Sequence, residues 1–445
     1  MTTTYAQRIG VFEGTMMVVG GIIGSGIFLN PAVVAQRAGT AGMTITAWLV
    51  GGAVAILGAF IYAELGGRRP EAGGGYAYLR DAFGPLPAFL YAWTLLLIIA
   101  TGAIAAVAMT FASYAGAVVG LPVTAITPMA LSAIVLLTGI NILGVKPSSV
   151  MTALFTLLKL VALGLLILAG LASMLGKGSL PTPVMLPLAR GSATVALAGA
   201  LVPVLFAYGG WQQTNFVAEE MVDAPRNLPR ALLWGVGIVV VVYLLANVVY
   251  LRALGVGGLA DSTAPAADTM QIFLGPAGRT FIAIGIALST FGFLNLAICA
   301  NARVYQAMAR DRLFFDAFAR LNPRFRTPAV ALIAQGVWAV VLVLSGTYGE
   351  LLDYVVFGDW IFFGLTAATL FYFRRQDALA GKTRPEFVTP AWRLSVLLFC
   401  AAAAYVVAGS ISASPANALR GAGLILLGVP LYLWRRRRLV EGTGR

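Results

Sequence analysis

The chain has 445 residues, of which 60% are hydrophobic and only 11% are charged, whereas soluble globular proteins contain roughly 45–50% and 25%. This composition excludes a soluble globular protein. There is no histidine, and the two cysteines, Cys299 and Cys400, lie far apart inside apolar segments. Neither a catalytic triad, a transition-metal site nor a disulfide framework is therefore expected, and we predict no enzyme and no cofactor.

Apolar runs of about 20 residues, the length that crosses a bilayer, recur from Val11 to the arginine cluster that begins at Arg435. The chain is therefore predicted to be an all-α integral membrane protein with twelve transmembrane helices. The expected spans are residues 12–37, 42–65, 86–116, 124–144, 149–174, 193–220, 231–252, 277–306, 329–346, 351–373, 393–412 and 418–434.

The net charge of +13 does not indicate nucleic-acid binding, because most of the 30 basic residues fall in alternate loops. The positive-inside rule then places both termini in the cytoplasm, and we expect a multi-pass protein of the plasma (inner) membrane. Within a span, only Lys159 is basic. The opposite side carries the few remaining basic residues, namely Arg37, Lys177, Arg190, Arg252, Arg279 and Arg420.

Two long spans are interrupted by glycines near their centres. The first contains Gly20, Gly21, Gly24 and Gly26, and the sixth contains the stretch 206–211, FAYGGW. Such breaks in corresponding positions of two halves indicate an inverted-repeat transporter, whose unwound segments form a substrate site near mid-membrane.

Because the two breaks are five spans apart, we expect a 5+5 inverted repeat. The predicted transporter core is 1–374, with repeats at about 11–175 and 193–374. Residues 375–445 would add helices 11 and 12 and a basic tail.

Six short stretches resemble the amino acid-polyamine-organocation (APC) superfamily of transporters, most closely a bacterial type of the L-type amino acid transporter branch. The resemblance extends over about residues 11–375 and implies a LeuT-like fold with discontinuous helices 1 and 6. The stretches are GSGIF at 24–28, YAELG at 62–66, GGGYAYL at 73–79, FAYGGW at 206–211, NFVAEE at 215–220 and AMAR at 307–310.

An unwound helix offers ligands for both ends of an α-amino acid. Unpaired N–H groups near Ser25, Gly26 and Ile27 are predicted to bind the carboxylate, at the positive end of a half-helix dipole. Freed carbonyls near Ile22 and at 206–209 suit the ammonium group.

The resemblance further implies that Ile22, Ser25, Gly26, Phe206 and Gly209 contact the substrate, with the ring of Phe206 as a lid. It also places Asn295 near the pocket. From the residues alone, a core aromatic is the alternative role for Phe206, and an interhelical hydrogen-bonding group is the alternative for Asn295.

Lys159 is predicted to lie roughly 15 Å deep in the fifth span, where it must face the protein interior. The resemblance implies that its ammonium replaces the cation that sodium-coupled relatives of this fold hold against the broken first span. A gating or coupling role for Lys159 is expected; a purely structural cation and a proton-releasing lysine remain alternatives.

Side-chain selectivity is assigned to small residues at 100–108 and to Ala297. No acidic residue is expected in the pocket, which favours neutral substrates, although Asp359 contradicts this if it faces the cavity. Glu64, Glu219 and Glu220 end spans on the cytoplasmic side, where Arg226 and Arg230 offer partners.

These features predict a secondary active transporter that moves neutral L-α-amino acids by alternating access, without sodium and by exchange. A proton-coupled symporter and a channel are the alternatives. The expected partners are the amino acid substrate and the lipid bilayer, with no nucleic acid; an accessory subunit is left open.

Overall fold

The computed structural model describes residues 5, 7–175, 193–345, 348–381, 385–413 and 415–442. Lys177, Arg190, Lys382, Arg384 and Arg445, whose side of the membrane was predicted, lie outside these residues. The described regular elements are all helical: α1 (Val11–Ile22), α2 (Gly26–Ala38), α3 (Ala41–Arg68), α4 (Gly75–Phe83), α5 (Pro85–Thr94), η1 (Leu95–Ile99), α6 (Ala100–Val119), η2 (Val123–Ala125), α7 (Ile126–Ile142), α8 (Val145–Leu175), α9 (Ala193–Ala207), α10 (Gln213–Phe216), η3 (Ala218–Glu220), α11 (Ala224–Asp261), α12 (Pro265–Arg310), α13 (Asp316–Ala319), α14 (Ala329–Ser345), α15 (Tyr348–Leu379), α16 (Trp392–Ala413), α17 (Pro415–Leu426) and α18 (Gly428–Gly442).

Among the described residues, 9 helices are long and apolar enough to cross a membrane, and the bent pair α1 and α2 makes up to 10. Two shorter apolar helices, α9 and α14, match the predicted sixth and ninth spans. The chain is therefore a multi-pass membrane protein. The total of twelve spans and the inverted repeat stay predictions.

Both predicted interruptions occur at the glycine clusters. α1 ends at Ile22 and α2 begins at Gly26, and the two helices are bent by 41°. α9 ends at Ala207, and helical structure resumes only at Gln213. The second half of the sixth span is not a regular helix of membrane length, because it consists of the short α10 and η3 separated by a single residue.

Two helices are longer than predicted. α11 contains a kink at Gly255, and α12 contains one at Gly275, where φ is positive in both cases. Glycine has no Cβ and adopts such angles without strain, so two helical segments join at each kink. α12 consequently begins at Pro265 rather than near residue 277.

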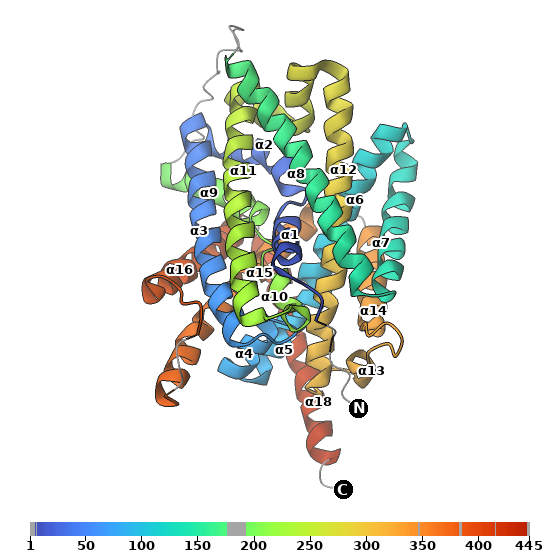
Figure 1. Ribbon diagram of the computed structural model, residues 1–445, viewed down its shortest axis with the longest axis vertical. Coiled ribbons are helices and arrows are strands. Elements are labelled where there is room, and N and C mark those ends of the chain that lie inside the picture. The colour runs from blue at the N-terminus through green and yellow to red at the C-terminus, as the bar shows by residue number, and fades with distance from the viewer. Residues whose placement is uncertain are drawn as a thin grey trace.

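The two broken helices lie in the middle of the bundle (Figure 1). α1 packs against α8, α11 and α12, while α2 packs against α9 and α11. α4, α13 and α18 lie toward one end of the bundle, the lower end in Figure 1. Basic residues of α4 and α18, among them Arg80 and Arg435, are thus carried by helices at the same end.

Candidate functional site

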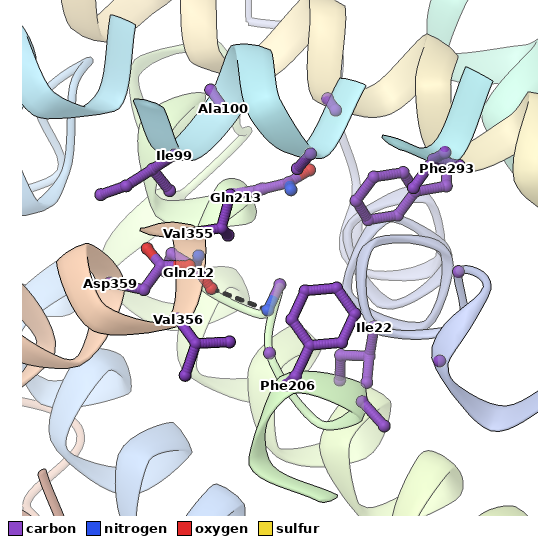
Figure 2. A pocket seen from close by; sticks show the side chains of 18 of the residues that line it. Ile22, Ile99, Ala100, Phe206, Gln212, Gln213, Phe293, Val355, Val356 and Asp359 are labelled. Atoms are coloured by element: carbon purple, nitrogen blue, oxygen red, sulfur yellow. Dashed lines mark hydrogen bonds between the residues drawn. The ribbon is translucent and has the colours of Figure 1, made fainter. Parts of the chain in front are cut away.

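A pocket lies where the two breaks face each other, in the interior of the bundle. Its lining comes from both breaks and from η1, α6, α12 and α15. Figure 2 shows Phe206 and Ile22 on one side of the pocket and Asp359 on the other. Five predicted substrate residues line it, namely Ile22, Ser25, Gly26, Phe206 and Gly209.

The first break presents free donors. Gly24 N–H donates to the carbonyl of Ile22 at 2.9 Å, whereas the N–H groups of Ser25 and Gly26 donate no hydrogen bond within the described part of the chain. These two groups open the first turn of α2, where the helix dipole is positive. The arrangement suits a carboxylate, as the sequence predicted.

The carbonyls at the two breaks are already partly engaged. The hydroxyl of Tyr243 lies 3.1 Å from the Ile22 oxygen and 3.2 Å from the Ala207 oxygen, and one hydroxyl hydrogen serves only one acceptor at a time. Tyr243 thereby links the two breaks from α11. Tyr243 was not predicted from the sequence. A tyrosine within an apolar span could have indicated it, because a buried hydroxyl requires a hydrogen-bond partner.

Close backbone packing joins the two breaks. A Cβ at Gly210, where φ is +114°, would lie 2.1 Å from the Gly21 oxygen. A Cβ at Gly26 would lie 2.8 Å from Cα of Ala207. Gly209 is less crowded, because its Cβ would meet the Phe206 oxygen at 3.3 Å. Glycine is therefore required at positions 21, 26 and 210 mainly because the two breaks contact each other there. This requirement was not predicted from the sequence.

Lys159 on α8 reaches the first break. Its ammonium donates to the carbonyls of Gly20 at 3.1 Å and of Ile23 at 2.5 Å, and its side chain is fully buried. Ser289 on α12 also donates to the Ile23 oxygen, at 3.2 Å. A cation thus sits against the carbonyl end of α1, facing inward as its depth predicted.

Two predicted residues do not line the pocket. Ile27 is buried in the core behind the first break. Asn295 donates to Thr152 at 2.9 Å and accepts from Asn141 at 2.9 Å. These bonds connect α12 with α8 and α7, which agrees with the interhelical alternative for Asn295.

The ring of Phe206 borders the pocket beside Ile22 (Figure 2) and is only partly buried. The ring also packs against the buried core, so the role of Phe206 as a lid stays a prediction. Ala100, Ala103 and Ala297, from the small-residue segments to which selectivity was assigned, line the same pocket.

The expectation that no acid faces the pocket is wrong. Asp359 on α15 lines it, together with Gln212 and Gln213 from the sixth-span break. From the sequence, Asp359 was expected near the outer part of its span, but the side of the helix that faces the pocket was not predictable. Only the packing of α15 against η1 and α6 turns this face of the helix inward.

The acids that were predicted to end spans on the cytoplasmic side pair with cations other than the two that were predicted. Glu64 binds Arg68 and Arg374, each at 2.7 Å. Glu219 pairs with Arg310 at 3.3 Å, and Glu220 pairs with Arg303 at 2.8 Å. The prediction that Arg226 and Arg230 pair with these acids is wrong. Basic residues of α12 and α15, which are distant in the sequence, contact the acids instead.

The segment before α1 is held at the same end of the bundle. Ile9 forms a parallel bridge with Met221, and Arg8 N–H donates to the Glu220 carbonyl at 2.8 Å. The guanidinium of Arg303 stacks over the ring of Tyr5 at 5.7 Å. These contacts hold the segment before α1 against the end of the sixth span and against α12.

A central pocket between two broken helices in a multi-pass helical bundle defines a membrane transport protein. A family model described as an amino acid permease matches residues 9–428, and the chain belongs to this family, within the APC superfamily. It is a permease and not an enzyme.

Several characterised transporters are similar along most of the chain. The human "Large neutral amino acids transporter small subunit 2" is 32% identical over 435 residues, covering 96% of this chain and 80% of the relative. The human "Asc-type amino acid transporter 1" is 32% identical, covering 97% and 83%. The Mus musculus "b(0,+)-type amino acid transporter 1" is 31% identical, covering 84% and 78%. The chain is thus related to amino acid transporters of the L-type branch.

Proposed function

We propose that the chain is a secondary active transporter that exchanges L-α-amino acids, neutral ones included, across the plasma membrane by alternating access. The observation that carries this proposal is the pocket itself, which combines the free N–H groups of Ser25 and Gly26 with the carbonyl of Ile22. A carboxylate and an ammonium group one carbon apart satisfy both at once. The substrate-contacting roles of Gly209 and Phe206 are part of the proposal; Ile27 and Asn295 would act by supporting the break and α12.

Sodium independence is supported by Lys159. Its ammonium occupies the space between the carbonyls of Gly20 and Ile23, so a positive charge is already present where the unwound helix needs one. A second cation in that space would be repelled. We infer that Lys159 holds the first break in position in place of a metal ion.

Alternating access requires that one end of the bundle opens while the other closes. With the termini in the cytoplasm, the contacts of Tyr5, Ile9, Glu220 and Arg303 would form the cytoplasmic closure. Breaking them would release α1 and expose the pocket. The proposed organisation remains a core at 1–374 built from two five-helix repeats, followed by two further helices and the basic tail.

The test is uptake into proteoliposomes loaded with unlabelled amino acids. Radiolabelled leucine should enter in a saturable way, faster when the lumen contains amino acid than when it is empty, and equally fast in sodium or choline. Accumulation driven by a pH gradient across empty vesicles would instead establish the proton-coupled symporter. Flux that rises linearly with concentration would establish a channel, and sodium-dependent flux would falsify the role of Lys159.

A further inference from the structure

Two hydrogen-bond acceptors that line the pocket have no donor within the described part of the chain. Gln213 is 6% exposed, and its Oε1 has no partner in the described structure. Asp359, which lines the same pocket, forms neither a hydrogen bond nor an ion pair with any other described residue. Its titratable neighbours are Tyr62 and Tyr91, and neither donates a hydrogen bond to it within the described part of the chain.

The two acids that are buried within the described part of the chain, Glu64 and Glu220, have partners. Glu64 accepts from two guanidinium groups and from the N–H of Thr389. Glu220 is paired with the buried Arg303. Each of these two structural acids is thus surrounded by hydrogen-bond donors, because an unpaired charge inside the bundle would be destabilising. Asp359 has no such donor among the described residues, and it faces the pocket.

The remaining polar groups nearby do not supply the missing donor. Gln212 lies beside Asp359 (Figure 2), and its Oε1 accepts from the N–H of Gly210 at 3.0 Å. Asn301, also in the lining, donates to its own helix, at the carbonyl of Ala297. A ligand that carries several N–H donors and a positive charge would satisfy Asp359, and Gln213 offers a further acceptor in the same lining.

The position of these acceptors identifies which part of a substrate they meet. Asp359 lies across the pocket from Ile22 (Figure 2), where the amino acid backbone is proposed to bind. A side chain that leaves Cα would cross the space lined by Ala100 and Val356 toward Asp359. The aromatic residues Phe206 and Phe293 lie on the other side.

We propose that Asp359 and Gln213 form a side-chain subsite that binds the terminal ammonium group of a basic amino acid. The subsite determines specificity, extending the substrate range from neutral side chains to cationic ones of about the length of lysine. It rests on the proposed function, because it presumes that an amino acid backbone is held at the first break.

The experiment measures equilibrium binding of radiolabelled L-lysine and L-norleucine to the purified full-length chain. The two ligands share the same carbon skeleton, and only lysine carries the terminal ammonium. Wild type should bind lysine at least about tenfold more tightly than norleucine, since a charge-assisted hydrogen bond contributes about 1.5–3 kcal/mol. Asp359→Asn should remove this preference and leave norleucine affinity within about twofold.

Two further variants keep the result independent of folding. Asp359→Glu reaches one methylene further into the pocket and should shift the preference from lysine toward ornithine, which is one methylene shorter. Asp261→Asn removes an exposed acid at the end of α11 and should change neither affinity. Thermal unfolding of each variant identifies any that are misfolded.

The outcomes separate this inference from the proposed function. If wild type binds norleucine and lysine equally and Asp359→Asn changes neither, the subsite is refuted while amino acid transport stands. If wild type binds neither ligand, nor any other α-amino acid, the proposed function itself fails. A preference for lysine that survives Asp359→Asn would also overturn the role of Asp359.

Discussion

Replacing Gly210 with alanine tests whether the two breaks depend on direct backbone contact. The new Cβ would lie 2.1 Å from the Gly21 oxygen, so the breaks must separate by about 1 Å in a closely packed interior. Overpacking of this kind costs about 1–3 kcal/mol. The positive φ of +114° adds about 1–3 kcal/mol of backbone strain for any residue other than glycine. We expect a total of about 2–6 kcal/mol.

Gly164→Ala on α8, outside the pocket lining, is the matched control, because its Cβ would meet nothing within 4 Å and the change should alter stability by less than about 1 kcal/mol. Thermal unfolding and amino acid binding of the two purified variants provide the comparison. Gly210→Ala should lower Tm by about 5 °C and weaken binding by at least about tenfold. If the two variants match in Tm and in affinity, the contact between the breaks does not hold the site together.

Phe206→Ala should reduce exchange by at least about fivefold per folded molecule with little change in Tm, because the ring covers the pocket as a lid. Lys159→Ala should slow flux about tenfold while substrate still binds, because the first break loses the cation that holds its carbonyls; flux and binding are measured separately. Glu220→Gln should destabilise the protein by about 3 kcal/mol in unfolding assays, because it leaves Arg303 buried and unpaired. Glu219→Gln, at an exposed pair, should cost under about 1 kcal/mol.

Each of these expectations has a contrary result. A large fall in Tm for Phe206→Ala with unchanged exchange would make that residue a core aromatic. If Lys159→Ala retains wild-type flux, the role of the lysine is only to hold helices together. Equal stability losses in Glu220→Gln and Glu219→Gln would show that burial of the Arg303 pair does not matter.

Much of the candidate site was predictable because glycine has local consequences. Clusters at 20–26 and 209–210 stand in corresponding positions of two long spans, so both breaks followed from spacing, whereas the substrate contacts were implied by the family resemblance. Lys159 was predictable as well, since a cation at mid-membrane depth must face the interior. The partners of these residues were not, because a carbonyl, a hydroxyl and an acid from different helices meet only after the helices pack.

The sequence by itself determined the membrane class, the helical secondary structure and the position of both breaks, since these depend on hydropathy and on backbone freedom within a single segment. Tertiary structure alone decided that Tyr243 links the breaks, that Asn295 joins three helices, and that Asp359 faces the pocket. A helix presents every side of its surface to some neighbour, and periodicity cannot say which side of an apolar helix meets the cavity.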